Sequence, residues 1–131
     1  MTEINQRDTN NNKTGYWEGY FNNGNLICKG NFINDKKTGY WEEYYSNGNL
    51  ANKGNFINDI KTDYWEWYHN SNGKLLWRKG NYVNGEPNGY WEIYYPNGNI
   101  WYKGNYLNDK QIDYWEIYNP NGNIETKIFF I

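Results

Sequence analysis

Five glutamates recur at nearly constant intervals, and they are the residues of this 131-residue chain that could most directly do acid–base chemistry. Catalysis by paired carboxylates needs two of them in different environments, so that one holds a proton and the other does not. Here each glutamate returns with the same neighbours and with a lysine 11 or 13 residues later, which indicates a structural ladder of opposed charges. The predicted pairs are Glu18 with Lys29, Glu42 with Lys53, Glu66 with Lys79, Glu92 with Lys103, and Glu116 with Lys127.

The other side chains capable of catalysis or metal binding are few and isolated. His69 is the only histidine, and the two serines, Ser46 and Ser71, both lie in predicted turns. Cys28 is the only cysteine, which excludes an internal disulfide and a cysteine-based metal site. The glycines have no phosphate-binding spacing. We therefore expect a protein that is not an enzyme and that has no catalytic residues, no cofactor and no metal ion.

The charge balance and the hydropathy restrict the partner and the location. The chain has 13 basic and 15 acidic residues and a net charge of −2, whereas proteins that bind nucleic-acid phosphates normally carry a basic excess. Residues 1–13 contain no apolar segment like that of a signal peptide, and no run of the chain approaches the length of a membrane span. We expect a cytoplasmic protein with no membrane partner, and nucleic acid is disfavoured.

A sequence repeat positions these residues and covers almost the whole chain. Its tryptophans, Trp17, Trp41, Trp65, Trp91 and Trp115, lie at intervals of 24, 24, 26 and 24 residues, which is typical of repeat architectures. Each repeat has two runs rich in aromatic residues around an Asn-Gly pair, which is a hairpin signal, and no window has helical periodicity. We predict an all-β fold, an elongated single-layer twisted antiparallel sheet of about ten strands from five tandem β-hairpin repeats. The repeats are about 15–38, 39–62, 63–88, 89–112 and 113–131, which form one domain at 14–131 after a disordered or loosely attached lead-in at 1–13.

The register of each hairpin follows from its Asn-Gly turn. In the second repeat the predicted opposed residues are Trp41 and Gly54, Glu42 and Lys53, and Tyr45 and Leu50. The third repeat has two extra residues, which must fall one on each side of the turn, within 70–75, if the register is to be kept. Pro96 favours a turn in which the proline is second. Between repeats we predict four-residue loops such as Asn34–Lys37, which again set lysine opposite glutamate and glycine opposite tryptophan.

Alternation along the strands predicts two different faces. The face with the tryptophans, the cross-strand glycines and the Phe residues is called the aromatic face below, and indoles over glycine are a known device of such sheets. The opposite face, called the charged face, carries the Glu/Lys pairs. Tyrosines flank these pairs at positions 16, 20, 40, 44, 64, 68, 90, 94, 114 and 118.

The repeat unit resembles the bacterial variant of the MORN (membrane occupation and recognition nexus) repeat over Gly15–Ile131. The resemblance rests on Asn-Gly turns at 23–24, 47–48, 72–73, 97–98 and 121–122 and on Lys-Gly-Asn-aromatic runs at 29–32, 53–56, 79–82 and 103–106. It implies a single-layer sheet of tandem hairpins, in agreement with the register. The variant family is often labelled as antitoxins of the YwqK type, which implies a toxin or effector nuclease encoded nearby as the partner and names no site residues. The membrane association of MORN repeats is weakly implied here, because the chain has no Lys/Arg cluster. Choline-binding repeats are a second, shorter-period resemblance.

Repeats three and four depart together from the unit. Trp77 and Trp101 are predicted on the charged face, opposite Tyr68 and Tyr94. On the aromatic face, Trp67, Arg78 and Tyr102 replace small or polar residues. Trp, Tyr and Arg dominate the energetics of protein interfaces. The alternative interpretation is that the extra rings only thicken the packing in the middle of the sheet. The candidate partner-binding residues are Trp67, Tyr68, Trp77, Arg78, Tyr94, Trp101 and Tyr102.

The end of the chain is the second departure, because Ile128 replaces the constant glycine and Lys127–Ile131 is apolar. Such an edge strand either covers the aromatic face or pairs with another chain, so self-association is possible. The leading functional hypothesis is a protein-binding module that neutralises or inhibits its partner, as an antitoxin, immunity protein or inhibitor does. The alternatives are binding of carbohydrate or single-stranded nucleic acid by stacked rings, and a structural scaffold that assembles through its edge strands.

Overall fold

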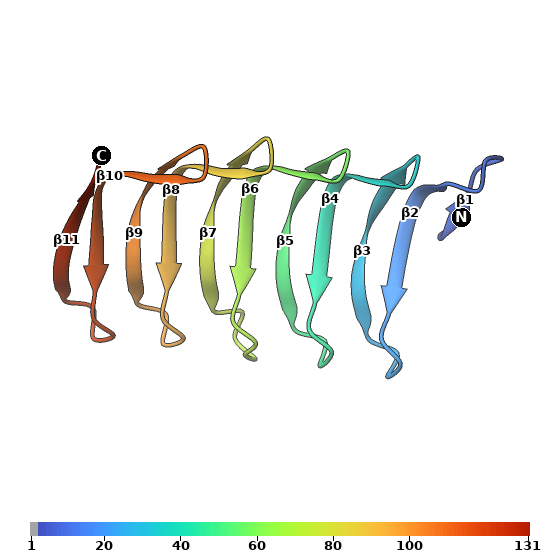
Figure 1. The fold of residues 1–131 in the computed structure, drawn as a ribbon. Helices are drawn as coiled ribbons and strands as arrows, with labels where there is room; N and C mark the ends of the chain where they lie inside the picture. Colours follow the sequence, from blue (N-terminus) through green and yellow to red (C-terminus); the bar gives the residue numbers. More distant parts are fainter. Residues whose placement is uncertain (1–2) are drawn as a thin grey trace.

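The computed structural model describes residues 3–131, which form one open antiparallel sheet of eleven strands (Figure 1). The strands follow one another in chain order, so each pairs only with its neighbours in sequence. This confirms the predicted single-layer sheet of tandem hairpins, to which β1 adds an eleventh strand. These residues contain no helix that could cross a membrane. The strands are β1 (Gln6–Arg7), β2 (Lys13–Tyr20), β3 (Leu26–Ile33), β4 (Lys36–Tyr44), β5 (Leu50–Ile57), β6 (Ile60–Tyr68), β7 (Leu76–Val83), β8 (Glu86–Tyr94), β9 (Ile100–Leu107), β10 (Lys110–Tyr118) and β11 (Ile124–Phe130).

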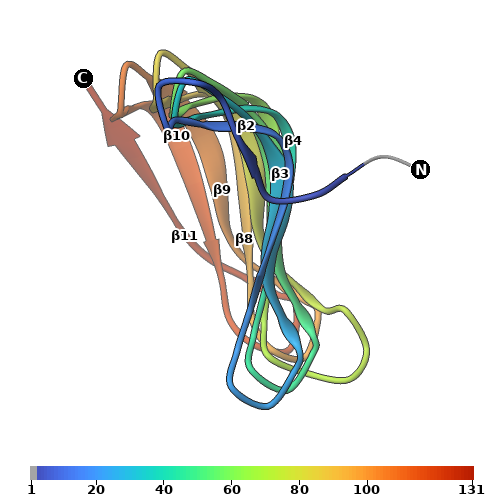
Figure 2. The ribbon, with the colours of Figure 1, turned by 90° about the vertical axis from the view of Figure 1, so that its right-hand side faces the viewer.

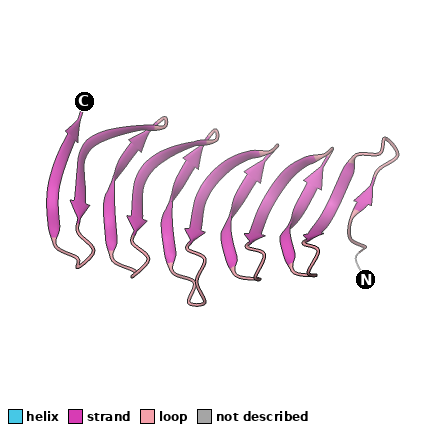
Figure 3. Cartoon of the chain, turned by 60° about the horizontal axis from the view of Figure 1, so that its bottom comes forward, coloured by secondary structure: helices cyan, strands magenta, loops and turns pink. Residues whose placement is uncertain are grey.

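The register predicted for the middle of each hairpin is confirmed. Trp41 pairs with Gly54 across β4 and β5, and the adjacent Glu42 pairs with Lys53. In the third repeat Trp65 still pairs with Gly80, because the longer loop between β6 and β7 takes up the two extra residues (Figure 3). The Asn-Gly turns therefore fix the register, as the sequence predicts.

The pairing predicted next to the turn is wrong. Tyr44, and not Tyr45, lies opposite Leu50, because Ala51 is the extra residue of a β-bulge. The same irregularity occurs in the other four repeat hairpins. A bulge changes which face the residues beside it reach, and this matters for the candidate site below.

The turn predicted at Pro96 is confirmed. The Gly98 amide donates a hydrogen bond of 3.0 Å to the carbonyl of Tyr95, so Pro96 is the second residue of a four-residue turn. Gly98 has a φ of 93°, a conformation that glycine adopts without steric cost.

The connections between repeats are shorter than predicted. The expected four-residue loop at Asn34–Lys37 is a two-residue turn, since Ile33 and Lys36 already pair. Asn34 and Asp35 have φ values of 50° and 65°, as a type I′ turn requires, and Asn and Asp tolerate that conformation. The predicted pairing of lysine with the glutamate of the next repeat is nevertheless present, because a second bulge restores it.

This second bulge bends every repeat. The segment Gly39–Trp41 of β4 lies opposite the single residue Gly30 of β3. Gly39 has a φ of 72°, and Asp63 takes the equivalent conformation in the next repeat with a φ of 61°. The end-on view in Figure 2 shows the bent profile that results. A single sheet can bury an indole completely only on the inner side of such a bend.

Residues 3–13 are attached to the first edge of the sheet. Gln6 pairs with Thr14, and Arg7 pairs with Lys13. The Asn5 side chain adds two hydrogen bonds to the backbone of Glu18, with lengths of 3.1 and 2.8 Å. Residues 1 and 2 of the predicted lead-in lie outside the described residues.

The opposite edge is β11, which pairs on one side only. Ile128 and Phe129 are exposed, although Phe129 packs on the Tyr114 ring at a centroid distance of 4.8 Å. Phe130 packs against the buried core. Covering of the aromatic face is therefore seen for Phe130, and self-association through Lys127–Ile131 stays a prediction.

Each turn that joins two repeats is linked to the turn before it by two hydrogen bonds. At the last two of these links along the chain only one bond is present. The Asp35 amide donates to the Lys13 carbonyl at 3.1 Å, and the Lys13 amide donates to Asp35 Oδ1 at 2.6 Å. Gly85 has no carboxylate and Pro87 has no amide hydrogen, so these two positions keep only the first bond. The residue pairs along the edge are Asp35 with Lys13, Asp59 with Lys37, Gly85 with Lys61, and Asp109 with Pro87.

The substitution Pro87→Lys is expected to raise the free energy of unfolding by about 1 kcal/mol. The restored amide can donate to the Asp109 carboxylate, and a hydrogen bond to a charged group contributes about 1.5–3 kcal/mol. Loss of the proline's restriction on the unfolded chain offsets roughly 0.4–1 kcal/mol of this. Urea unfolding measures the difference. The same gain in an Asp109→Ala background would contradict the explanation, because that background has no acceptor.

Candidate functional site

A row of four tryptophans, called the indole row, forms the core on the inner side of the bend. Trp65 is 0% exposed, and its Nε1 donates a hydrogen bond of 3.1 Å to the carbonyl of Asn55. Phe56 packs edge-on against the same ring at 5.0 Å, and a Cβ on Gly54 would lie 2.1 Å from it. The structure thus confirms the predicted packing of indole over cross-strand glycine. The indole row consists of Trp41, Trp65, Trp91 and Trp115.

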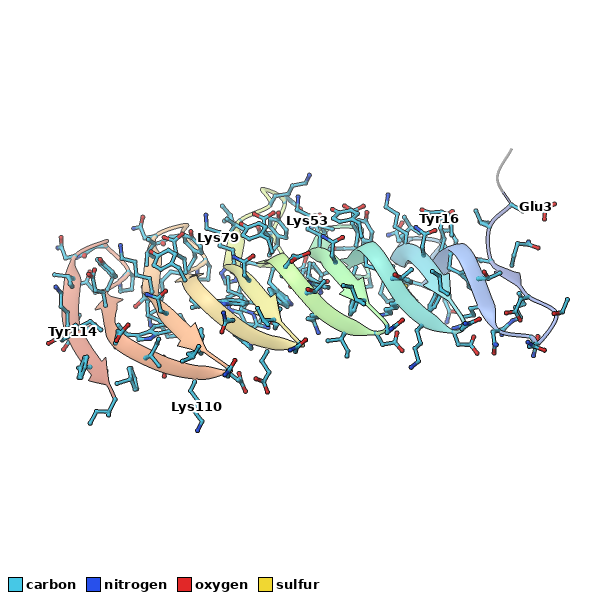
Figure 4. All side chains as sticks on the ribbon, turned by 90° about the horizontal axis from the view of Figure 1, so that it is seen from above. Glu3, Tyr16, Lys53, Lys79, Lys110 and Tyr114 are labelled. Carbon is cyan, nitrogen blue, oxygen red and sulfur yellow. The ribbon has the colours of Figure 1, made fainter. Side chains whose placement is uncertain are left out.

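Three lysines of the charged face, Lys29, Lys53 and Lys79, bind the glutamate of the following repeat. Lys53 Nζ lies 3.4 Å from Glu66, and two neighbouring junctions have the same contact at 3.3 and 3.4 Å. Tyr64 and Tyr68 also donate hydroxyl hydrogen bonds to Glu66, at 3.1 and 2.9 Å. Figure 4 shows Lys53 on the same side of the sheet as Tyr16 and Lys79. This face satisfies its own charges and leaves few free for a ligand.

Tyrosines on the charged face are weaker acids than free tyrosine. Burial, followed by the charge of Glu42, raises the pKa of Tyr40 to about 12. Burial and Glu66 raise the pKa of Tyr64 to about 12 in the same way. These hydroxyls therefore stay protonated at neutral pH and remain available as donors to the glutamates.

On the aromatic face, one line of cross-strand neighbours changes character between the second and third repeats. Trp67 pairs with Asn52 on one side and with Arg78 on the other, and Arg78 pairs in turn with Ile93. The positions up to Asn52 are small or polar, and those from Trp67 to Ile117 are large. In chain order the line is Gly19, Cys28, Glu43, Asn52, Trp67, Arg78, Ile93, Tyr102, Ile117 and Thr126.

Three of the predicted site residues form one cluster, which we call the Arg78 cluster: Trp67, Trp77 and Arg78. The guanidinium carbon of Arg78 lies 4.2 Å from the Trp67 ring centroid and 4.9 Å from that of Trp77. Trp67 is itself buried and stacks on Trp65 at 5.4 Å with an interplanar angle of 30°. The indole row therefore supports the cluster from below.

The predicted placement of Trp77 and Trp101 on the charged face is wrong. Each is the extra residue of a β-bulge, because Leu76 pairs with Tyr68 and Ile100 pairs with Tyr94. The bulge brings both indoles to residues of the aromatic face: Trp77 contacts Arg78, and Trp101 contacts Tyr102 at 5.3 Å. Trp101 also stacks on Tyr95 at 5.1 Å and 18°. Trp77 is 39% exposed and Trp101 is 42% exposed.

Tyr68 and Tyr94 do not join this surface. Their hydroxyls donate to Glu66 and Glu92 at 2.9 and 3.0 Å, so they belong to the charged face. Tyr68 is also buried. The structure thus brings together five of the seven predicted residues on the aromatic side, in two neighbouring groups, and assigns the other two to the network of the opposite face. The five are Trp67, Trp77, Arg78, Trp101 and Tyr102.

Sequence reasoning missed two hydroxyls near Arg78. Tyr82 and Tyr106 take the positions that Phe32 and Phe56 hold in the first two repeats. Burial raises the pKa of Tyr82 to about 12 although the nearby Arg78 guanidinium opposes the shift. Burial likewise raises the pKa of Tyr106 against the same guanidinium. The change from Phe to Tyr in the same two repeats was a signal in the sequence.

His69, the one histidine, has a structural position. Its Nε2 lies 3.2 Å from the carbonyl of Tyr94 in the next repeat. Tyr45 reaches the equivalent carbonyl of Tyr68 at 2.7 Å from the same position of its own repeat. The His69 ring also lies 6.3 Å from the Trp77 ring. It therefore links two repeats beside the Arg78 cluster.

The aromatic face also has a hollow of about 330 Å³ near its C-terminal end. Most of its lining residues are apolar. They are Tyr102, Gln111, Trp115, Ile117, Ile128 and Phe130. The hollow adjoins the group of Trp101 and Tyr102, so the exposed rings and the hollow together extend over the last three repeats.

The comparison with protein families agrees with this geometry. The MORN repeat variant model matches residues 13–34, 37–58, 87–108 and 114–131, which is more than half of the chain. Residues 59–86, which carry the Arg78 cluster, lie between the matched segments. No curated protein matches the chain. From its matched repeats and its hairpin architecture, the chain belongs to the MORN repeat variant family.

Proposed function

We propose that this protein is a non-enzymatic binding module that holds a partner protein on its aromatic face and neutralises it, as an antitoxin, immunity protein or inhibitor does. The partner is a toxin or effector nuclease encoded nearby, and the two meet in the cytoplasm. Membership of the MORN repeat variant family supports a binding module. The repeats supply a rigid sheet, and repeats three and four supply the recognition residues.

One observation carries the proposal: Trp77 and Trp101 are 39% and 42% exposed on the aromatic face, whereas the indole row is buried. Exposed indoles beside an arginine have the composition of interface hot spots. The Arg78 cluster and the hollow near the C-terminal end give this surface both a charge and an apolar recess. On the charged face, by contrast, the paired lysines and glutamates offer little to a partner.

The test is co-expression with the product of each adjacent gene, with complex formation and growth rescue as readouts. The double variant Trp77→Ala with Trp101→Ala is expected to weaken the complex at least about thirtyfold, because even one hot-spot residue contributes about 2 kcal/mol or more. The matched control is Ile33→Ala with Ile57→Ala, which removes two side chains of 58% and 60% exposure at the other end of the repeats. This control is expected to bind normally.

Two results would contradict the proposal. An intact complex with the Trp77→Ala and Trp101→Ala double variant would show that another surface binds the partner. A complex that forms without relieving the partner's toxicity would show binding without neutralisation.

A further inference from the structure

Arg78 is a cation held in place without an anion. Its guanidinium contacts the rings of Trp67 and Trp77, with its carbon 4.2 and 4.9 Å from the two centroids. Within residues 3–131 no carboxylate lies within ion-pair distance of it, and its Nε is buried without a hydrogen-bond partner. The buried Nε is itself out of a ligand's reach, but Arg78 as a whole is only partly buried, so its remaining donors can meet an external acceptor.

Lysines of the charged face near Arg78, unlike Arg78, form ion pairs within the sheet. Lys53 and Lys79 each bind a glutamate at 3.4 Å on the other face. Their charges are therefore neutralised within the sheet. On the aromatic face Lys61 also lies over an indole, 5.5 Å from the Trp65 centroid, without an ion pair among the described residues, but of these two cations only Arg78 has a planar fork of donors.

The surroundings of Arg78 define the size and the chemistry of that charge. Tyr82 packs on the Trp67 ring that also contacts Arg78, at a centroid distance of 5.7 Å, and the Arg78 charge opposes the rise in the pKa of Tyr82. Exposed Trp77 and Trp101 flank the position with apolar surface. A ligand that fits carries one compact anion next to apolar groups, which is the chemistry of an Asp or Glu side chain within an apolar segment.

A carboxylate suits this position better than a phosphate. The indole rings cover the faces of the Arg78 guanidinium, so a ligand approaches its edge, where the planar fork of donors matches a carboxylate in two parallel hydrogen bonds. Phosphate recognition, in nucleic acid or in lipid, depends on several cations together, and the chain has a net charge of −2.

We infer that Arg78 binds a side-chain carboxylate of the partner protein, positioned by Trp67 and Trp77 and assisted by the Tyr82 hydroxyl. The inference rests on the proposed function and specifies the partner: its docking segment has an acidic residue flanked by apolar ones. The two indoles hold the fork in one orientation, which lowers the entropy lost on binding.

The probe is the capped peptide acetyl-Leu-Asp-Leu-amide, compared with the same peptide carrying Asn in place of Asp. The chain has two arginines, Arg7 and Arg78, so the Nε–H signals of both can be followed by NMR during titration. The acidic peptide is expected to shift the Arg78 signal at millimolar concentration, with about tenfold preference over the Asn peptide, since one charged hydrogen bond contributes about that factor. The Arg7 signal is expected to stay in place.

The variants Arg78→Met and Arg78→Lys, followed by the indole N–H signals of Trp67 and Trp77, are expected to abolish this preference, the second because it keeps the charge and loses the fork. Arg7→Met is the matched control, because Arg7 also lies over an indole, 5.4 Å from the Trp17 centroid, and is expected to leave the preference unchanged. Equal binding of the two peptides, no shift of Arg78 at all, or equal displacement by inorganic phosphate would each overturn the inference.

The carboxylate inference and the proposed function can fail independently of each other. If a neighbouring gene product forms a neutralised complex that Arg78→Met does not weaken, the carboxylate assignment alone is wrong. If the peptides behave as expected and no adjacent gene product binds, the proposal of a neutralised neighbour is the one that fails.

Discussion

The substitution Gly54→Ala is expected to lower the free energy of unfolding by at least about 3 kcal/mol, the upper end of what overpacking a core costs. A Cβ at this position would lie 2.1 and 2.2 Å from two atoms of the Trp65 ring. The ring has no room to retreat, because Phe56 packs on it at 5.0 Å and Trp67 stacks on it at 5.4 Å. Either the indole leaves the bend or the two strands separate.

The matched control for this substitution is Gly19→Ala. Both glycines lie within strands, neither has a left-handed backbone, and both lie at paired positions of the sheet. A Cβ at Gly19 would meet its nearest atom, the sulfur of Cys28, at 3.4 Å, which is an ordinary contact. Urea unfolding followed by tryptophan fluorescence measures both variants. Similar losses at the two positions would mean that a general effect of adding a methyl group to a strand, and not the contact with Trp65, explains the role of Gly54.

The sequence was sufficient to predict the pairs within each hairpin, because these depend only on period and spacing. Side chains alternate along a strand, so a turn of known centre determines every opposed pair until a bulge intervenes. Trp41 with Gly54 and Trp65 with Gly80 therefore follow from counting. The extra residues of repeat three leave the count unchanged, because they fall on both sides of its turn.

The bulges could not be counted in advance, because they depend on backbone conformation. Gly39 and Asp63 both adopt positive φ, of 72° and 61°, although they are different residue types. The predicted four-residue loop at Asn34–Lys37 kept the strands in strict alternation without these bulges. Lys37 in fact lies within β4, with its ammonium 4.9 Å from the Trp41 ring centroid.

The bulges also explain why only part of the candidate site was predicted on the correct face. Composition identified repeats three and four as different, and Trp67, Arg78 and Tyr102 lie on the predicted face. Trp77 and Trp101 were assigned by strict alternation to the other face, and the bulge beside each turn reverses that assignment. The sequence was sufficient to show which residues of repeats three and four differ from the repeat unit. Which of these residues lie together could be determined only from the geometry of the sheet.

The substitution Trp65→Ala is expected to lower the free energy of unfolding by about 4 kcal/mol, as removal of a large buried aromatic side chain does. Trp65 is 0% exposed, and its Nε1 donates to the carbonyls of Asn55 and Thr62 at 3.1 and 3.2 Å. Both carbonyls would lose this donor. Because each repeat is stabilised only by its neighbours, a defect in the middle of the sheet weakens both halves.

The contrasting variant is Trp77→Ala, which is expected to cost less than about 1 kcal/mol in the same urea unfolding experiment, because Trp77 is 39% exposed and lies at a bulge outside the indole row. A loss as large as that of Trp65→Ala would place Trp77 in the core and remove the reason for assigning it to recognition. If Trp77→Ala leaves stability almost unchanged, then its effect on a complex measures contact with the partner. The stability of this variant therefore decides how the binding experiments on Trp77 and Arg78 are to be interpreted.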